Sequence, residues 1–327
     1  MKCNSCSFPI RKGEKAILCD VCQKDVHKEC AIIEDGKVYC DSCYMSKTED
    51  DNNPILDVEV PEVIRRSYIQ LYKTCPFKFY NEVILGHKQP ENIYAKIGIE
   101  LHDLFDKANT NKSYKIDEMK DDMLRNLTYY PKELYTGSLN EEWAVIRAMS
   151  SIDTYYHVTK DMPELFASEE TLQFSVGEDL PMVQATSDRV NRIGGDLHVL
   201  DWKTGNVIVG KAISSDLQAP LYIHSIREKY NLPVKTFTFY YLKDNKIRQF
   251  EQISDDKYVC KVGKREYFIS ITEAIREVQQ IFSKVKSAQF NIPTDAKNMY
   301  YHCKMCHIKE KGLCEGSEMQ SWNQYNK

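Results

Sequence analysis

The chain has 327 residues, which corresponds to about two domains at roughly 100 to 200 residues each. Its 44 basic and 48 acidic residues give a net charge of -4, which excludes a uniformly basic coat for nucleic acid, so a polyanion site has to be local. A mean hydropathy of -0.52, without an apolar run near the ~20 residues that a bilayer requires, predicts no membrane span.

The first residues lack the apolar core of a signal peptide, so we expect a reducing compartment, the cytoplasm of a bacterial or phage-infected cell. There, Cys-x-x-Cys pairs are more typical of metal sites than of disulfides. Eight soft ligands follow one another near the start: Cys3, Cys6, Cys19, Cys22, His27, Cys30, Cys40 and Cys43. They suffice for two tetrahedral Zn²⁺ sites, and a segment this short needs metal ligation in order to fold.

The order of four cysteines, one histidine and three cysteines resembles cross-braced zinc fingers of the PHD type, over residues 1–45 only. The resemblance implies one zinc on Cys3, Cys6, His27 and Cys30 and a second on Cys19, Cys22, Cys40 and Cys43. Sequential pairing, with Cys3, Cys6, Cys19 and Cys22 on one ion, stays open. Val38 stands where such fingers usually carry Trp, and the module has no Trp for a methyl-lysine cage. We therefore expect a docking module for protein or DNA.

An acidic segment with Asn and Pro, residues 46–61, is expected to be a linker to a large domain over residues 62–327. Apolar residues at helical spacing predict helices over 65–85, 94–108, 115–127 and 140–158.

The pattern then changes to extended segments. Strands are predicted over 172–176, 182–190 and 197–202, the last two joined by a hairpin turn within 191–195. A helix over 215–229, a second hairpin of 236–242 with 247–253, and a helix over 270–287 follow. The expected fold class is α/β, a small mixed sheet flanked by helices.

The hairpin over 182–203 carries the candidate catalytic groups. Asp188 precedes its turn by about six residues and Asp201 follows it by about six, so antiparallel pairing brings two carboxylates together, as a divalent cation requires. Alternation along the strand places Asp201 and Lys203 on one face and Trp202 on the other. An ammonium group there can steer an attacking water and neutralise charge on a phosphate.

Two helices add polar groups. Gly98 and His102 are four residues apart on one helix face, so the missing side chain leaves space beside an imidazole that can complete the ligands of a cation. A single histidine on a helix is also typical of packing. Gln218 and Tyr222 share a helix face, which fits either DNA contact or packing.

In order and gaps, Gly98-x3-His102, Asp188-Arg189-Val190, Asp201-Trp202-Lys203-Thr204-Gly205 and Gln218-x3-Tyr222 resemble the RecB-like branch of the PD-(D/E)xK nucleases, over roughly residues 65–315. The resemblance implies a restriction-endonuclease-like core with Mg²⁺ or Mn²⁺ on His102, Asp188 and Asp201. It also implies Lys203 as the water-orienting base, with Gln218 and Tyr222 beside the substrate. Ala185 replaces the glycine of the family's Gly-x-x-Asp motif, a change that removes no ligand.

Further candidates surround these residues. Glu169 or Glu170 could add an outer ligand. Phosphate contacts are expected from Arg189, Arg192, Lys203 and Lys211. Base stacking is open to Tyr72, Tyr80, Tyr300 and Tyr301, although tyrosines also fill core edges.

Four more cysteines bracket the large domain, namely Cys75 and, far downstream, Cys303, Cys306 and Cys314. This layout resembles AddB-like helicase-nucleases and CRISPR-associated iron-sulfur exonucleases, in which four thiolates hold a [4Fe-4S] cluster. The resemblance implies one structural cluster that joins the first helix to the end of the chain. A zinc-type site on the same cysteines is the alternative. Cys260 has no partner in this pattern and is expected to be a small buried hydrophobe.

The sequence thus predicts a metal-dependent deoxyribonuclease, an exonuclease on single strands or ends, in recombination, repair or the replication of a phage or mobile element. It contains no Gly-x4-Gly-Lys-[Ser/Thr] motif, so a motor would be a partner, such as a helicase docked through the zinc module. The alternative is a catalytically silent zinc-finger adaptor that binds nucleic acid or a protein. The set of His102, Asp188, Asp201 and Lys203 favours the enzyme, because binding alone has no chemical need for all four.

Overall fold

The computed structural model describes residues 16–28, 31–34, 36–40, 59–89, 92–135, 141–293, 303 and 306–314. The chain divides into two compact units, Met1–Asp57 and Val58–Lys327. Most of the predicted linker, 46–61, lies outside the described residues. In the described part, no helix is both long and apolar enough to span a bilayer.

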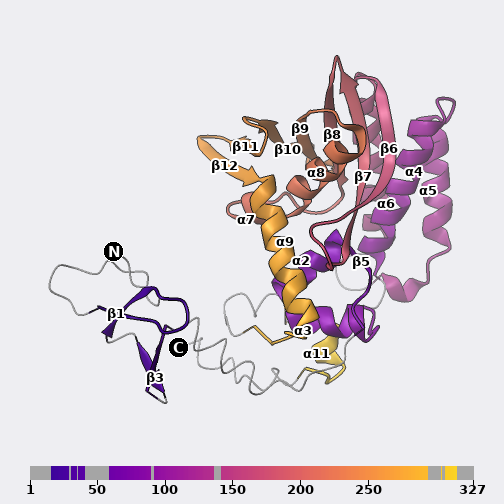
Figure 1. Cartoon of the computed structure of the whole chain (residues 1–327). Helices are drawn as coiled ribbons and strands as arrows, with labels where there is room; N and C mark the ends of the chain where they lie inside the picture. The colour runs from indigo at the N-terminus through magenta and orange to yellow at the C-terminus, as the bar shows by residue number, and fades with distance from the viewer. Residues whose placement is uncertain are drawn as a thin grey trace. The chain divides into compact units, whose positions relative to one another are not determined.

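The first unit contains two short antiparallel hairpins (Figure 1). Strand β1 (Ala16–Leu18) pairs with β2 (Asp25–His27), and β3 (Ile32–Glu34) pairs with β4 (Lys37–Tyr39). Asp20, in the turn after β1, joins the two hairpins, because its carboxylate accepts a hydrogen bond from the Val38 backbone N–H at 2.6 Å. The described apolar core here is small, with only Cys19, Val26 and Cys40 buried in it, so burial alone contributes little to folding.

The second unit opens with a short strand and a series of helices. These are β5 (Val63–Arg65), α2 (Arg66–Thr74), α3 (Pro76–Phe79), the π-helical turn η2 (Tyr80–Ile84), α4 (Ile93–Thr110), α5 (Ile116–Thr128), the 3-10 turn η3 (Lys132–Leu134) and α6 (Glu141–Thr159). The single helix expected over 65–85 is therefore interrupted. Pro76 forces the preceding Cys75 into an extended conformation, which ends α2 and starts α3.

The central sheet has eight strands and is mixed. Its remaining strands are β6 (Leu165–Phe174), β7 (Met182–Ile193), β8 (Asp196–Lys203), β9 (Val234–Tyr241), β10 (Lys246–Gln252), β11 (Lys257–Val262) and β12 (Arg265–Ser270). The order is β12-β11-β10-β9-β8-β7-β5, and β6 also pairs with β7. The β5–β7 and β8–β9 pairs are parallel and the others antiparallel. The sheet is larger than the sequence pattern predicted, because β5 and the β11–β12 hairpin join it.

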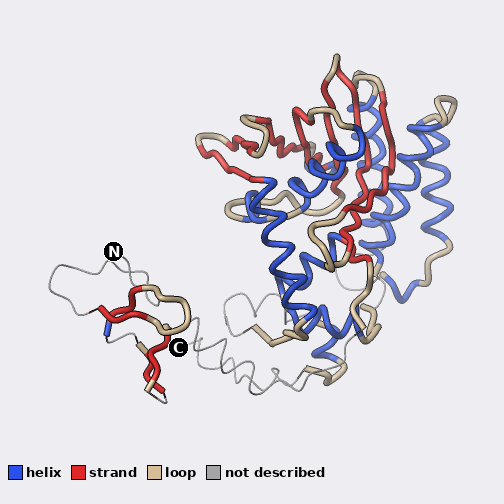
Figure 2. The backbone as a smooth tube through the Cα atoms, viewed as in Figure 1, coloured by secondary structure: helices blue, strands red, loops and turns tan. Residues whose placement is uncertain are grey.

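Helices cover the sheet on both sides (Figures 1 and 2). The later ones are α7 (Ala212–Ser215), α8 (Gln218–Tyr230), the turn η4 (Leu242–Asp244), α9 (Ile271–Lys286) and α11 (His307–Glu310). One core cluster joins the sheet to α2, α8 and α9, and another joins it to α4, α5 and α6. Along β8, Val199 belongs to the first cluster, whereas Leu200 and Trp202 belong to the second. Asp201 and Lys203 therefore lie on the opposite face of β8 from Trp202.

Candidate active site

The β7–β8 hairpin brings two buried carboxylates to neighbouring strands. Arg189 pairs with Leu200 and Val190 with Val199, and the same register places Asp188 opposite Asp201. The tight turn at Gly194, where φ is +59°, fixes this register. Asp188 is locked in place because its Oδ2 accepts a hydrogen bond from the Trp202 backbone N–H at 2.6 Å.

Asp201, Lys203 and Gln218 form a closed polar triangle. Lys203 Nζ lies 2.8 Å from Asp201 Oδ2 and donates to Gln218 Oε1 at 2.7 Å. The Gln218 amide N–H in turn donates to Asp201 Oδ1. Gln218 begins α8, where Asp216 Oδ1 accepts its backbone N–H at 2.6 Å, so the start of this helix holds both charged groups in position.

The Asp201 carboxylate is buried and has one oxygen, Oδ2, that is engaged only by the ion pair with Lys203 among the described residues. The side chain is 3% exposed, and burial raises its pKa to about 6 although Lys203 favours the ionised form. Among the described residues, Oδ2 accepts no hydrogen bond and lies 2.8 Å from the Lys203 ammonium, its ion-pair partner. A buried carboxylate oxygen that accepts no hydrogen bond is a suitable ligand for a metal cation.

His102, Glu169 and Asp188 form a second part of the site. His102 Nδ1 lies 3.4 Å from Asp188 Oδ1 and 3.6 Å from Glu169 Oε1. One ligand atom from each of the three fits within a span of 4.8 Å. Burial opposes the charge on the imidazole, but Asp188, Glu169 and Asp201 outweigh it and raise the pKa of His102 to about 10. One imidazole and several carboxylates are ligands for Mg²⁺ or Mn²⁺.

The pairing of β6 with β7 places Glu169, and not Glu170, in this cluster. Ser168 pairs with Arg189 and Glu170 with Ser187, so Glu169 lies opposite Asp188. Its φ of +47° is uncommon for a residue other than glycine and marks a strained position of the kind found at functional sites. Glu170 instead forms an ion pair with Lys229.

Replacing Glu169 by glutamine is expected to weaken Mn²⁺ binding by roughly tenfold to 100-fold, because an oxygen ligand or its orienting partner loses its charge. The matched change Glu170→Gln, one residue along the same strand, should leave the affinity unchanged. Isothermal titration of both variants with Mn²⁺ measures the difference. Equal affinities in the two variants would remove Glu169 from the site.

Gly98 lies where α4 passes the segment that directly follows Lys203. A Cβ added there would lie 3.4 Å from Thr204 Oγ1, which is close to ordinary van der Waals contact. The space that the missing side chain was expected to leave beside His102 stays a prediction.

Several residues expected to contact the substrate are engaged in the fold. Arg189 is 7% exposed, and its guanidinium donates to Asn191, Asn109 and the Pro163 carbonyl. Three of its donors are therefore used within the protein, and its contact with phosphate stays a prediction. Arg192 lies near the hairpin turn, where it donates to the Gly194 carbonyl.

The two predicted helix residues are also buried. The Gln218 amide bonds to Asp201 and Lys203, so it positions these residues, and its contact with DNA stays a prediction. Tyr222 is buried, and burial raises the pKa of its hydroxyl.

The described tyrosines that were predicted to stack on bases contact other parts of the fold. Tyr72 donates to the Gln289 carbonyl at 2.5 Å, and Tyr80 stacks on Phe290 with ring centroids 4.7 Å apart. Tyr300 and Tyr301 lie outside the described residues.

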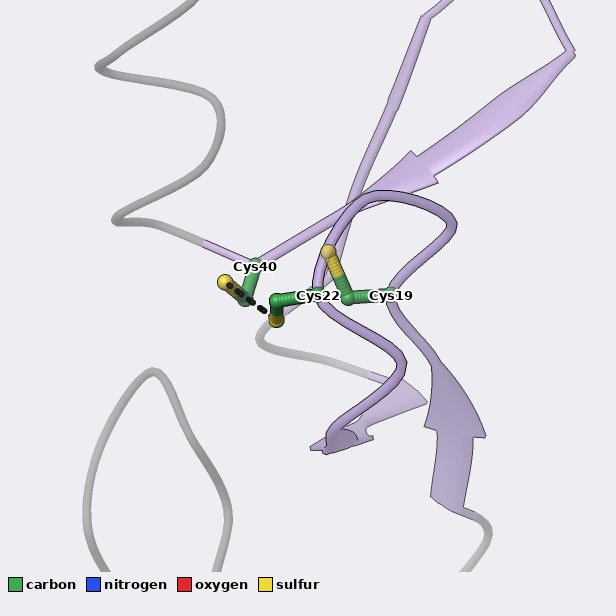
Figure 3. Close-up of side chains that lie close together, drawn as sticks. All are labelled: Cys19, Cys22 and Cys40. Carbon is green, nitrogen blue, oxygen red and sulfur yellow. Dashed lines mark hydrogen bonds between the residues drawn. The ribbon is translucent and has the colours of Figure 1, made fainter.

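In the first unit, Cys19, Cys22 and Cys40 converge (Figure 3). Their sulfurs all lie within 4.8 Å of one another, and the Cys22–Cys40 distance is 3.8 Å. Burial opposes ionisation of Cys19, but backbone N–H groups of Cys22, Cys40 and Val21 lower its pKa to about 6. Other predicted zinc ligands lie outside the described residues, namely Cys3, Cys6, Cys30 and Cys43, as does the side chain of His27.

In the second unit, Cys75 lies near three cysteines from the end of the chain. Its Sγ accepts the Lys78 N–H at 3.4 Å and caps α3. Burial raises the pKa of the Cys75 thiol, and the charges of Cys306, Cys303 and Cys314 raise it further. His307 anchors this segment, because its Nε2 lies 3.0 Å from the His87 carbonyl oxygen and 3.6 Å from Glu82 Oε1.

A mixed sheet with two aspartates and a lysine at one hairpin is the arrangement of a metal-dependent nuclease. The family model of the PD-(D/E)XK nuclease superfamily matches residues 66–311, and the chain belongs to this superfamily. No curated protein matches the chain. Among solved structures, one titled "Crystal structure of SSO0001" is similar at 13% identity, covering 83% of this chain and 93% of that chain with a TM-score of 0.37.

Proposed function

We propose that the protein is a Mg²⁺- or Mn²⁺-dependent DNA exonuclease acting on single strands or DNA ends. Superfamily membership implies a metal-dependent nuclease, and the finer assignment rests on the site. The observation that carries it is the meeting of Asp188, Asp201 and Lys203 at one hairpin, with an Asp201 oxygen that accepts no hydrogen bond from the described residues.

The donors present fit a hard divalent cation. Asp188 and Asp201 would supply carboxylate oxygens and His102 an imidazole nitrogen, with Glu169 close enough to ligate or to orient His102. When bound, the cation supplies Lewis-acid stabilisation of the charge that develops on the phosphoryl oxygens.

The chain's own groups would do the remaining work. Lys203 Nζ, held by Asp201 and Gln218, would orient the attacking water by donating a hydrogen bond to its oxygen and would stabilise the negative charge that develops there. Gln218 would keep the ammonium and the carboxylate at a fixed separation, so that no reorganisation is needed at the moment of reaction.

The test of this function compares linear and circular single-stranded DNA of one sequence in the presence of Mn²⁺. An exonuclease degrades only the linear form, and 5'- and 3'-labelled linear strands then reveal the direction of digestion. Cleavage of both forms would show an endonuclease. If neither form is cut and the protein only binds them, it acts as an adaptor instead.

For the first unit, we propose a cross-braced module with two zinc ions. The proximity of Cys40 to Cys19 and Cys22 supports this pairing over the sequential one, in which Cys40 would belong to the other ion. The Cys22–Cys40 separation of 3.8 Å supports a tetrahedral zinc, because Zn–S bonds of about 2.3 Å place neighbouring sulfurs about 3.8 Å apart. The module would dock the nuclease to DNA or to a protein, such as a helicase.

Replacing Cys40 by serine is expected to lower the zinc content by about one equivalent, because three ligands hold zinc poorly and the hairpins lack an apolar core. Metal analysis after dialysis against a chelator measures the loss. The control is Cys260→Ser, which changes a buried cysteine in the second unit. A Cys40→Ser protein with the full zinc content would exclude this residue as a ligand.

For the cysteines of the second unit, we propose one [4Fe-4S] cluster on Cys75, Cys303, Cys306 and Cys314. Their mutual effect on thiol pKa supports a shared site. Among the described residues, no three of these sulfurs lie within 4.8 Å of one another. The ligands of a single zinc ion have to lie that close together, whereas those of a larger iron-sulfur cluster do not.

Replacing Cys75 by serine is expected to abolish the visible absorption of the anaerobically purified protein and its content of iron and acid-labile sulfide. The variant should also unfold more readily, because the tie between α3 and the end of the chain is lost. Cys260→Ser should retain the colour. A colourless wild-type protein that contains more zinc than the two ions proposed for the first unit would instead identify a zinc site on these four cysteines.

A further inference from the structure

A groove lies beside the catalytic hairpin. Side chains of α4, α6 and the segment after β8 enclose about 980 Å³, with Tyr94, Trp143, Ile146, Arg147, Thr204 and Lys243 among the lining residues. Thr204 directly follows Lys203 in the chain, so the groove adjoins the backbone segment that leaves the catalytic strand, although Lys203 is not itself among its lining residues.

Large rings face solvent in this groove. Trp143 is 55% exposed and Tyr94 is 45% exposed, which leaves ring surface available to a ligand. Arg147 ties the two helices to the active-site segment, because its guanidinium lies 5.5 Å from the centre of the Tyr94 ring and donates to the Thr204 carbonyl. Arg147 therefore joins the Tyr94 ring to the backbone that directly follows Lys203.

The charge of the groove favours an anionic ligand. Arg147 and Lys243 are cationic, and none of the described lining residues carries a carboxylate. This local excess of positive charge stands against a net charge of -4 for the whole chain. Exposed aromatic rings beside cations are the two elements with which proteins hold single-stranded nucleic acid, the rings stacking on bases and the cations meeting phosphates.

We propose that this groove binds the unpaired nucleotides next to the scissile phosphate, with Trp143 stacking on a base and Lys243 and Arg147 facing the backbone. The inference rests on the proposed nuclease function and specifies its substrate as a single strand or a frayed end. A paired duplex would not satisfy the groove, because its base faces are already stacked on one another and only their edges are accessible.

The test measures binding in EDTA, where no cleavage occurs, by the fluorescence anisotropy of a labelled oligothymidine and of a duplex of equal length. Trp143→Ala should weaken single-strand binding about 5-fold to 100-fold and leave duplex binding unchanged. Trp143→Phe should retain most of the affinity because it keeps a stacking ring. Phe268→Ala is the control, since Phe268 is 52% exposed on β12 at the far edge of the sheet.

Cleavage of the same oligonucleotide in Mn²⁺ separates this inference from the nuclease proposal. If the wild type cleaves DNA and Trp143→Ala binds the single strand as tightly as the wild type, the groove proposal is overturned and the nuclease stands. An equal loss of single-strand and duplex binding would also overturn it. If the wild type cleaves neither the single strand nor the duplex, the nuclease proposal fails. The groove then cannot be the site that binds the substrate of a nuclease.

Discussion

Asp201→Asn is expected to reduce Mn²⁺-dependent DNA cleavage on the order of 10³-fold, which is the effect of removing several kcal/mol of metal-derived stabilisation from the transition state. Asparagine has the shape of aspartate but not its charge. The change therefore removes a ligand oxygen, Oδ2, that accepts no hydrogen bond from the described residues, while it fills the same volume between Lys203 and Gln218.

Single-turnover cleavage of an end-labelled strand measures the effect on the reaction, and calorimetric titration with Mn²⁺ measures the effect on the cation. Asp196→Asn is the matched control, because Asp196 begins the strand that Asp201 helps to end. Circular dichroism establishes that both variants are folded. Cleavage by Asp201→Asn at the wild-type rate would remove Asp201 from the mechanism.

The pairing of the carboxylates could be predicted from the sequence because it depends on local rules. A Gly-Gly turn fixes the hairpin register, and a strand alternates its faces every residue, so the positions of Asp188, Asp201 and Lys203 follow from counting. The predicted turn was too wide, since the observed turn is confined to Gly194 and Gly195. Its centre still lies midway between the two aspartates.

Roles that depend on distant partners could not be predicted. Arg189 follows Asp188 directly and looks available to phosphate, but Asn109, 80 residues away, accepts from its guanidinium. Likewise, alternation implies that only one of Glu169 and Glu170 faces the site, and the backbone conformation at Glu169 decides which one.

The proposed groove aromatics, Tyr94 and Trp143, could not be singled out from the sequence for a similar reason. The tyrosines predicted to stack on bases lie near the cysteines, where Tyr72 and Tyr80 pack against the core. Tyr94 and Trp143 belong to helices α4 and α6, which are separated in sequence and pack on each other in the fold, with Arg147 placed against the Tyr94 ring. Their nearness depends on this tertiary packing, which the sequence pattern does not give.

The strands β11 and β12 at one edge of the sheet were not predicted, because charged residues interrupt the apolar pattern of their sequence. Lys257 and Lys261 lie near the two ends of β11, and Arg265 and Glu266 begin the edge strand β12, where charged residues discourage pairing with another chain.

Lys203→Ala is expected to lower the turnover of single-stranded DNA by about 10²-fold to 10³-fold, the usual contribution of one positioned donor that stabilises charge in the transition state. Affinity for the strand in EDTA should change little, because the ammonium is held by Asp201 and Gln218 at the reacting position. Lys246→Ala is the control, since Asp244 and Lys246 repeat the Asp-x-Lys spacing at an exposed turn. Pre-steady-state kinetics separates turnover from binding. A loss of affinity with unchanged turnover would show that Lys203 only attracts the phosphate and that another group orients the water.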